Sequence, residues 1–295
     1  MQRLQARDFH PEVMRLFNRY IHGGIDRRTF LADASRYTVT GVTASMLLDS
    51  LMPRYAEAAV VQPNDARIVT RRVDVPSPQG HGTVKAYVAE PANRSGRLPG
   101  ILVIHENRGL NPHIEDIARR LALDNFVAVA PDGLSGAGGY PGDEEKAAAA
   151  YRAIDKNKML NDFIATAQWL REQPAVNGKW GAVGFCAGGT AVNTIATRLP
   201  DMTAGVPFYG GAPDLADITR TKARLQMHFA GNDEFINPRW PAHEAALKAA
   251  GVRYEAFVYA NTLHGFNNDT TPCYDANAAK AAWERTVTFF NQNLR

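Results

Sequence analysis

The chain has 295 residues, enough for one large α/β domain or two small ones, and 45% of them are hydrophobic against 21% charged. A net charge of +3, with no basic cluster interleaved with aromatic residues, argues against nucleic-acid binding. Two cysteines, Cys186 and Cys273, are too few for a disulfide scaffold or a multi-cysteine zinc site, and no apolar run is long enough for stable insertion in a membrane.

Residues 1–62 form an N-terminal extension that allows two interpretations. Residues 9–20 place apolar side chains on one helical face, which predicts an amphipathic helix that packs on the domain or on a second copy of the chain in a homo-oligomer. Alternatively, Arg27 and Arg28 with their surroundings resemble a twin-arginine export signal, and residues 56–58 resemble its cleavage site. The first interpretation leaves the protein in the cytoplasm, and the second sends it to the periplasm.

Apolar runs alternate with helical patterns through residues 63–295, which predicts a single domain. The expected strands are 67–76, 83–90, 100–105, 126–130, 180–185, 203–209, 224–230 and 253–259. The expected helices are 113–124, 143–154, 160–172, 190–198, 238–250 and 275–294. The first two strands flank a turn rich in Pro and Gly, which predicts an antiparallel hairpin. The later alternation predicts a mostly parallel central sheet flanked by helices, an α/β fold.

A strand, a sharp turn and a helix meet at Gly184-Phe185-Cys186-Ala187-Gly188. This matches the G-x-nucleophile-x-G pattern, with cysteine in the place of the usual serine. The turn lifts the nucleophile above the sheet, and the backbone N–H of Ala187 then faces the position where an oxyanion would form. The alternative is a glycine-rich turn around an inert buried cysteine.

Asp233 and His264 each follow a predicted strand. Because the carboxyl ends of parallel strands meet at one edge of a sheet, both side chains can converge on Cys186. The order nucleophile, acid, histidine is that of the α/β hydrolases. In this interpretation Cys186 attacks a carbonyl, His264 transfers the proton, and Asp233 orients the imidazole. On its own, Asp233 could equally be a turn residue.

Glu106 and Asn107 follow the strand 100–105, where an α/β hydrolase places its oxyanion loop, so the N–H of Asn107 is the expected second donor. The segments around Glu106, Cys186, Asp233 and His264 (IHENRGL, GFCAGG, GND and LHGF) resemble the dienelactone hydrolases, or carboxymethylenebutenolidases. The resemblance covers about residues 65–295. It implies an α/β-hydrolase fold and cleavage of a small-molecule ester or lactone through a thioester on Cys186, without metal or cofactor.

The resemblance also implies that Glu106 interacts with the Cys186 thiol at rest and accepts its proton when substrate binds. The arginines with which dienelactone enzymes bind the substrate carboxylate have no counterpart after the fourth strand or after His264. Arg108 is a candidate substitute. The candidate pocket walls are the aromatic residues Tyr140, Tyr209, Phe266 and Trp240.

Three other functions are compatible with parts of this pattern. Amidotransferase-like proteins also place cysteine at a strand–helix turn, but a histidine usually follows it where Ala187 stands here. A binding protein could retain the fold without catalysis. A redox sensor would use Cys186 as the reactive thiol and Cys273 as the resolving one.

Overall fold

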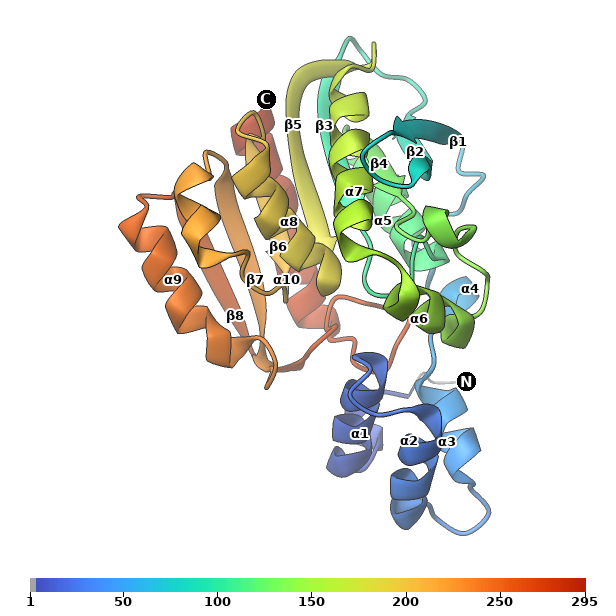
Figure 1. Ribbon diagram of the computed structural model, residues 1–295. Helices are drawn as coiled ribbons and strands as arrows, with labels where there is room; N and C mark the ends of the chain where they lie inside the picture. Colours follow the sequence, from blue (N-terminus) through green and yellow to red (C-terminus); the bar gives the residue numbers. More distant parts are fainter. Residues whose placement is uncertain (1–3) are drawn as a thin grey trace.

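The computed structural model describes residues 4–295. Within that range one sheet has eight strands in the order β1-β2-β4-β3-β5-β6-β7-β8, shown in Figure 1. β1 pairs antiparallel with β2, and β2 antiparallel with β4, while the other neighbouring pairs are parallel. The strands are β1 (Ile68–Ser77), β2 (Gly82–Pro91), β3 (Leu98–Ile104), β4 (Val127–Pro131), β5 (Val176–Phe185), β6 (Ala204–Phe208), β7 (Arg224–Asn232) and β8 (Tyr254–Leu263). The expected hairpin and the mostly parallel sheet are confirmed.

Helices cover both faces of the sheet because alternate residues of its central strands point to opposite sides. In β5, Phe185 joins the core under α5 (Pro112–Leu123) and α10 (Ala276–Leu294). Trp180 of the same strand joins the core under the helices of the other face. Those helices are α7 (Lys156–Arg171), α8 (Ala187–Arg198) and α9 (Trp240–Ala249), and α6 (Glu144–Ala153) precedes them in the chain.

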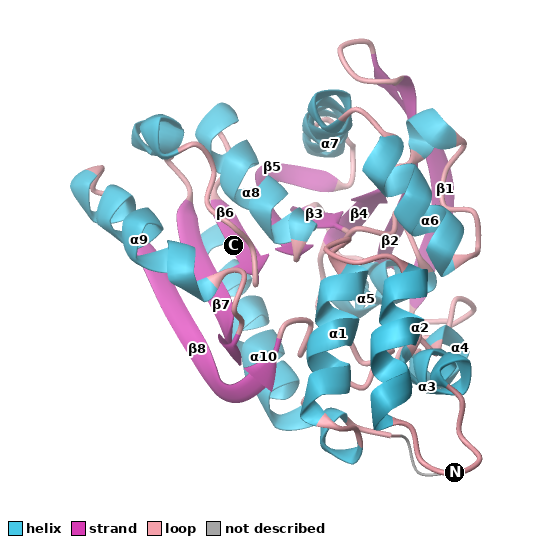
Figure 2. Ribbon diagram, turned by 60° about the horizontal axis from the view of Figure 1, so that its bottom comes forward, coloured by secondary structure: helices cyan, strands magenta, loops and turns pink. Residues whose placement is uncertain are grey.

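The N-terminal extension is helical and packs at the edge of the sheet where the parallel strands end (Figure 1). Its helices are α1 (Pro11–Ile21), α2 (Arg27–Ala34), α3 (Ala44–Leu51) and α4 (Tyr55–Ala58). α1 and α2 lie side by side in Figure 2, and with α3 they enclose a small apolar core around Phe17, Phe30 and Leu51. Leu263 and Cys273 of the domain pack against that core.

Several polar contacts attach the extension to the domain. The N–H of Val61 donates to Asp116 at 2.8 Å, and the N–H of Arg54 donates to the Thr270 carbonyl at 2.9 Å. Arg27, the first residue of α2, pairs with Glu145 of α6. Within residues 4–295, none of the helices has both the length and the apolar character needed to cross a membrane.

Candidate active site

Cys186 lies at the turn between β5 and α8, with φ 55° and ψ −115°. This left-handed conformation is strained for a residue with a side chain. The turn is tight enough that a Cβ on Gly184 would lie 2.2 Å from the Gly188 carbonyl oxygen, and one on Gly188 would lie 2.3 Å from the Ile104 oxygen. Glycine at both positions therefore allows the close approach of strand and helix that holds Cys186 in place.

Asp233 and His264 follow the ends of β7 and β8 and form a buried pair. Asp233 Oδ1 accepts the backbone N–H groups of Phe235 at 3.0 Å and Ile236 at 3.1 Å. Its Oδ2 lies 2.6 Å from His264 Nδ1. Held in this way, His264 keeps Nε2 for chemistry, and that buried atom has no hydrogen-bond partner among the described residues.

His22 lies against the thiol, which the sequence analysis did not foresee. It follows the last residue of α1, and its Nε2 is 3.6 Å from Cys186 Sγ. Its Nδ1 is 2.7 Å from the Asn18 carbonyl oxygen, which can only accept, so Nδ1 carries a hydrogen and Nε2 is the atom that faces the thiol. The ring stacks on Phe235 and meets the His264 ring edge-on, with centroids 5.2 and 4.4 Å apart.

These neighbours change the protonation of the thiol. Burial alone would raise the pKa of Cys186, but the charge of His264 and the hydrogen bond with His22 outweigh it and lower the pKa to about 6. Burial alone would lower the pKa of His264, but Cys186 and Asp233 outweigh it and raise the pKa to about 10. Near neutral pH the pair is therefore a thiolate and an imidazolium.

Glu106 lines the same cavity as Cys186, and its Oε2 accepts a 2.9 Å hydrogen bond from Asn268 Nδ2. Glu106 therefore forms its hydrogen bond with Asn268, whereas the Cys186 thiol contacts His22. Asn107 follows Glu106, and its side-chain amide donates to the Ile21 carbonyl of α1 at 2.6 Å. The other expected oxyanion donor, Ala187, is the first residue of α8.

The cavity above Cys186 has a volume of about 60 Å³ and is closed partly by the extension. Phe17, Ile21 and Tyr55 of the extension line it together with Arg108 of the domain. Arg108 Nη1 donates to the Asn107 side-chain oxygen at 2.7 Å and lies 3.4 Å from the Ile21 carbonyl oxygen. Arg108 is thus at the site, but held by the end of α1.

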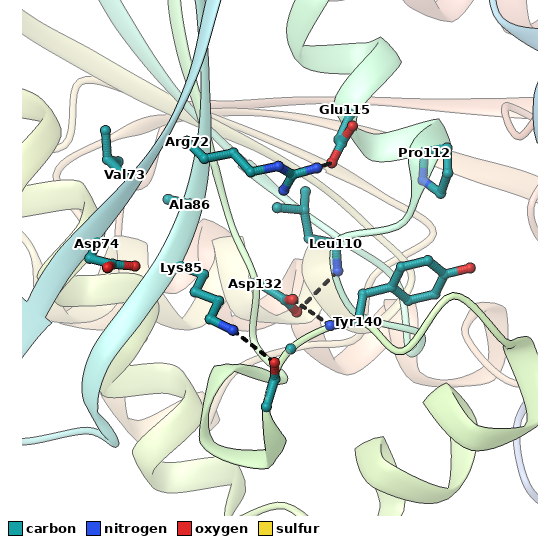
Figure 3. Close-up of a pocket in the computed structure, with 12 residues that line it drawn as sticks. Arg72, Val73, Asp74, Lys85, Ala86, Leu110, Pro112, Glu115, Asp132 and Tyr140 are labelled. Atoms are coloured by element: carbon teal, nitrogen blue, oxygen red, sulfur yellow. Dashed lines mark hydrogen bonds and ion pairs between the residues drawn. The ribbon is translucent and has the colours of Figure 1, made fainter.

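The aromatic residues named as pocket walls lie elsewhere. Tyr140 lines a separate pocket of about 600 Å³, shown in Figure 3, where its backbone N–H donates to Asp132. Tyr209 and Phe266 are buried in the core, where the Tyr209 ring lies 4.7 Å from the His264 ring and supports it. Trp240, the first residue of α9, packs on Phe229 of β7.

Cys273 also lines the cavity, and both cysteines are free thiols. Burial, and next the charge of Glu106, raise the pKa of Cys273 to about 12. Because a thiol must ionise to react, we expect Cys273 to be much less reactive near neutral pH than Cys186.

Comparison with known proteins agrees with this fold. The model of the “Dienelactone hydrolase family” matches residues 84–294, and a second model, “YqhI-like”, matches residues 1–39. The chain is 49% identical over 114 residues, 39% of its length, to 97% of the “Putative hydrolase fragment YghX” of Escherichia coli (strain K12). It is 31% identical over 250 residues, 80% of its length, to 91% of a “Putative carboxymethylenebutenolidase” of the same strain.

Among solved structures, the “Putative Dienelactone Hydrolase from Klebsiella pneumoniae subsp. pneumoniae MGH 78578” superposes with a TM-score of 0.69 at 26% identity. The match covers 76% of this chain and 99% of that one. The family model spans the whole segment from Glu106 to His264. The chain is therefore a member of the dienelactone hydrolase family, a carboxylic ester hydrolase of the α/β-hydrolase superfamily.

Proposed function

We propose that the protein cleaves its ester or lactone substrate by nucleophilic catalysis, with Cys186 as nucleophile, His264 as acid and base, and Asp233 as the residue that orients His264. The observation that carries this proposal is the buried His264–Asp233 pair, 2.6 Å apart, beside a cysteine held in a strained turn. A buried histidine with one nitrogen anchored and the other unpaired is prepared for proton transfer.

In the proposed reaction the Cys186 thiolate attacks the substrate carbonyl carbon. The N–H groups of Asn107 and Ala187 stabilise the oxyanion. The intermediate collapses to a thioester, and the His264 imidazolium gives its proton to the departing alkoxide oxygen. Neutral His264 then takes a proton from water, whose oxygen attacks the thioester carbonyl. Collapse of the second intermediate releases the acid and restores the thiolate beside protonated His264.

The resting thiolate is the point at which this mechanism departs from the one implied by the family resemblance. There Glu106 would accept the thiol proton only after substrate binds. Here Glu106 is held by Asn268, while His264 and His22 are the neighbours that lower the pKa of Cys186. We therefore assign stabilisation of the thiolate to His264, with support from His22.

Arg108 is the proposed partner of a substrate carboxylate. Its guanidinium lines the cavity, and one of its acceptors, the Ile21 carbonyl oxygen, belongs to the extension. Movement of α1 away from the site would remove the Ile21 contact, while the hydrogen bond of Nη1 to Asn107 and the 3.7 Å ion pair of Nε with Glu144 would remain. An anionic group would then bind the other N–H groups of the guanidinium.

The test is mass spectrometry of the intact protein during turnover of p-nitrophenyl acetate and of cis-dienelactone, with Cys186→Ala alongside. We expect a transient acyl adduct on Cys186 of the wild type and none on the variant. Ester cleavage by Cys186→Ala at the wild-type rate would refute the nucleophile. A redox function predicts instead rapid oxidation of Cys186 and a disulfide with Cys273, which the raised pKa of Cys273 opposes.

A further inference from the structure

Three metal-binding side chains converge where the extension meets the domain. The ligand atoms of His22, Cys186 and His264 all lie within 4.8 Å of one another. The distance from His22 Nε2 to Cys186 Sγ is 3.6 Å. With Zn–S near 2.3 Å and Zn–N near 2.0–2.1 Å, a tetrahedral zinc ion places its sulfur and nitrogen ligands about 3.6 Å apart.

The two imidazoles are oriented as metal ligands are in proteins. A ligating histidine commonly donates its other ring N–H to a carboxylate or a backbone carbonyl. His264 Nδ1 faces Asp233 Oδ2 at 2.6 Å, and His22 Nδ1 faces the Asn18 carbonyl oxygen at 2.7 Å. The remaining nitrogen of His264 is a buried polar atom without a hydrogen-bond partner among the described residues. An unsatisfied buried atom of this kind is costly, and a bound cation would satisfy it.

We propose that His22, Cys186 and His264 form a binding site for a borderline-soft divalent cation, with Zn²⁺ as the fitting ion. Thiolate and imidazole donors select such ions over Mg²⁺ or Ca²⁺, which prefer oxygen. Binding removes the one proton shared by Cys186 and His264, which passes to the solvent, and His22 binds in its neutral form with the hydrogen on Nδ1. The fourth coordination position is open to the small cavity and is filled by water.

The site has a consequence for regulation because one ligand belongs to the extension and two belong to the proposed catalytic triad. A bound ion would occupy the nucleophile and its base, and would also tie α1 to the domain. The predicted effect is reversible inhibition by zinc with the extension closed. This effect on turnover rests on the function proposed above, whereas the binding site itself does not.

The experiment measures metal affinity without catalysis. Metal-free full-length protein competes with a chromophoric chelator for Zn²⁺, as wild type, Cys186→Ala and His22→Gln. The control is His10→Asn at the other, exposed end of α1, which keeps a capping side chain for the helix. We expect at least about tenfold weaker binding for the two site variants and wild-type affinity for the control. Circular dichroism confirms that each variant is folded.

A second readout identifies the ligands. Co²⁺ in place of Zn²⁺ should give the visible bands of tetrahedral cobalt and a thiolate charge-transfer band that Cys186→Ala abolishes and His22→Gln alters. Wild-type affinity in His22→Gln, or cobalt spectra without thiolate character, would overturn the site. Zinc binding as expected in a protein that cleaves no ester would leave the site standing and refute the catalytic proposal instead.

Discussion

The activated thiol of Cys186 makes a prediction at the scale of one residue. Its pKa is lowered to about 6, below the value near 8.5 of a free cysteine, so the thiolate is present above pH 6 and is lost as the pH falls through 6. We expect the rate constant of alkylation by iodoacetamide to be level from pH 7 to 9 and to fall about tenfold per unit well below pH 6.

Peptide mapping assigns the alkylated residue, and Cys273, with its pKa raised to about 12, should remain unmodified. If the pH dependence of the alkylation rate constant had its midpoint between pH 8 and 9, the resting thiol would be protonated at neutral pH. That outcome would return the role of proton acceptor to Glu106, as the family resemblance implies.

Arg108 carries the second prediction. If its guanidinium binds the substrate carboxylate, Arg108→Gln should raise KM for cis-dienelactone about 10–100-fold, the loss of a charged hydrogen bond. KM for p-nitrophenyl acetate, which has no carboxylate, should change little. Steady-state kinetics on both substrates make the comparison within one protein. An equal rise in KM for both substrates would mean that Arg108 acts by positioning Asn107, whose side-chain oxygen it contacts at 2.7 Å.

Sequence reasoning at this scale succeeds where a residue's position follows from its strand. Asp233 and His264 come after strand ends, and Cys186 lies in a turn with its own pattern, so their meeting could be anticipated. His22 could not, because it lies 164 positions before Cys186 and ends an ordinary amphipathic helix. Nothing local distinguishes such a histidine from one on the surface. Tyr209 does not line the cavity above Cys186, because its ring turns into the core beside His264, and spacing alone does not indicate that orientation.

The turn at Cys186 gives a prediction at the scale of the element. In Gly184→Ala the added methyl would lie 2.2 Å from the Gly188 oxygen, so β5 and α8 must separate. We expect the free energy of unfolding to fall by about 1–3 kcal/mol, as for overpacking in a core, and the reactivity of Cys186 to fall with it. Urea denaturation measures the first effect, and iodoacetamide alkylation measures the second.

The matched control is Gly211→Ala, whose new methyl would meet the Thr190 side chain at 3.3 Å rather than a backbone oxygen. Because a side chain can rotate away, Gly211→Ala should lower the free energy of unfolding much less than Gly184→Ala does. Equal destabilisation by the two substitutions would contradict the idea that close backbone approach at the turn is the reason for glycine.

The ends of elements were the least predictable part of the fold. β5 begins at Val176, although residues 177–179 (Asn-Gly-Lys) are typical of a loop. Val176 pairs with Leu98 of β3, and this long-range partner brings polar, exposed residues into the strand. β8 likewise runs to Leu263 across a register shift opposite Ala230 and Asn232 of β7. Such pairing depends on the neighbouring strand, which the local pattern does not contain.

At the scale of the whole molecule, the extension encloses the site. A cavity of about 60 Å³ is far below the roughly 300–1,000 Å³ of pockets that bind small molecules. We therefore expect the extension to move when substrate enters. Because α1–α3 share an apolar core around Phe17 and Leu51, we expect these helices to move together. The competent open form would then be a fraction of the population, and the apparent KM would equal the intrinsic value divided by that fraction.

Arg27 offers the sharpest test of this closure, since its ion pair with Glu145 of α6 ties α2 to the domain away from Cys186. Both side chains are partly exposed, so the pair is worth about 0.2–1 kcal/mol. Arg27→Gln should therefore raise kcat/KM for p-nitrophenyl esters up to about fivefold by favouring the open form. Arg28→Gln removes the same charge from an exposed neighbour and should leave kcat/KM unchanged.

Hydrogen exchange provides the physical readout, because amides of α1 should exchange faster in Arg27→Gln than in Arg28→Gln. Faster exchange without a gain in kcat/KM would mean that opening does not limit substrate entry. A fall in kcat/KM, with faster exchange, would mean instead that docked α1 takes part in catalysis. His22, the residue of the extension at the thiol, would then be the group through which α1 contributes, and His22→Gln should show the same fall.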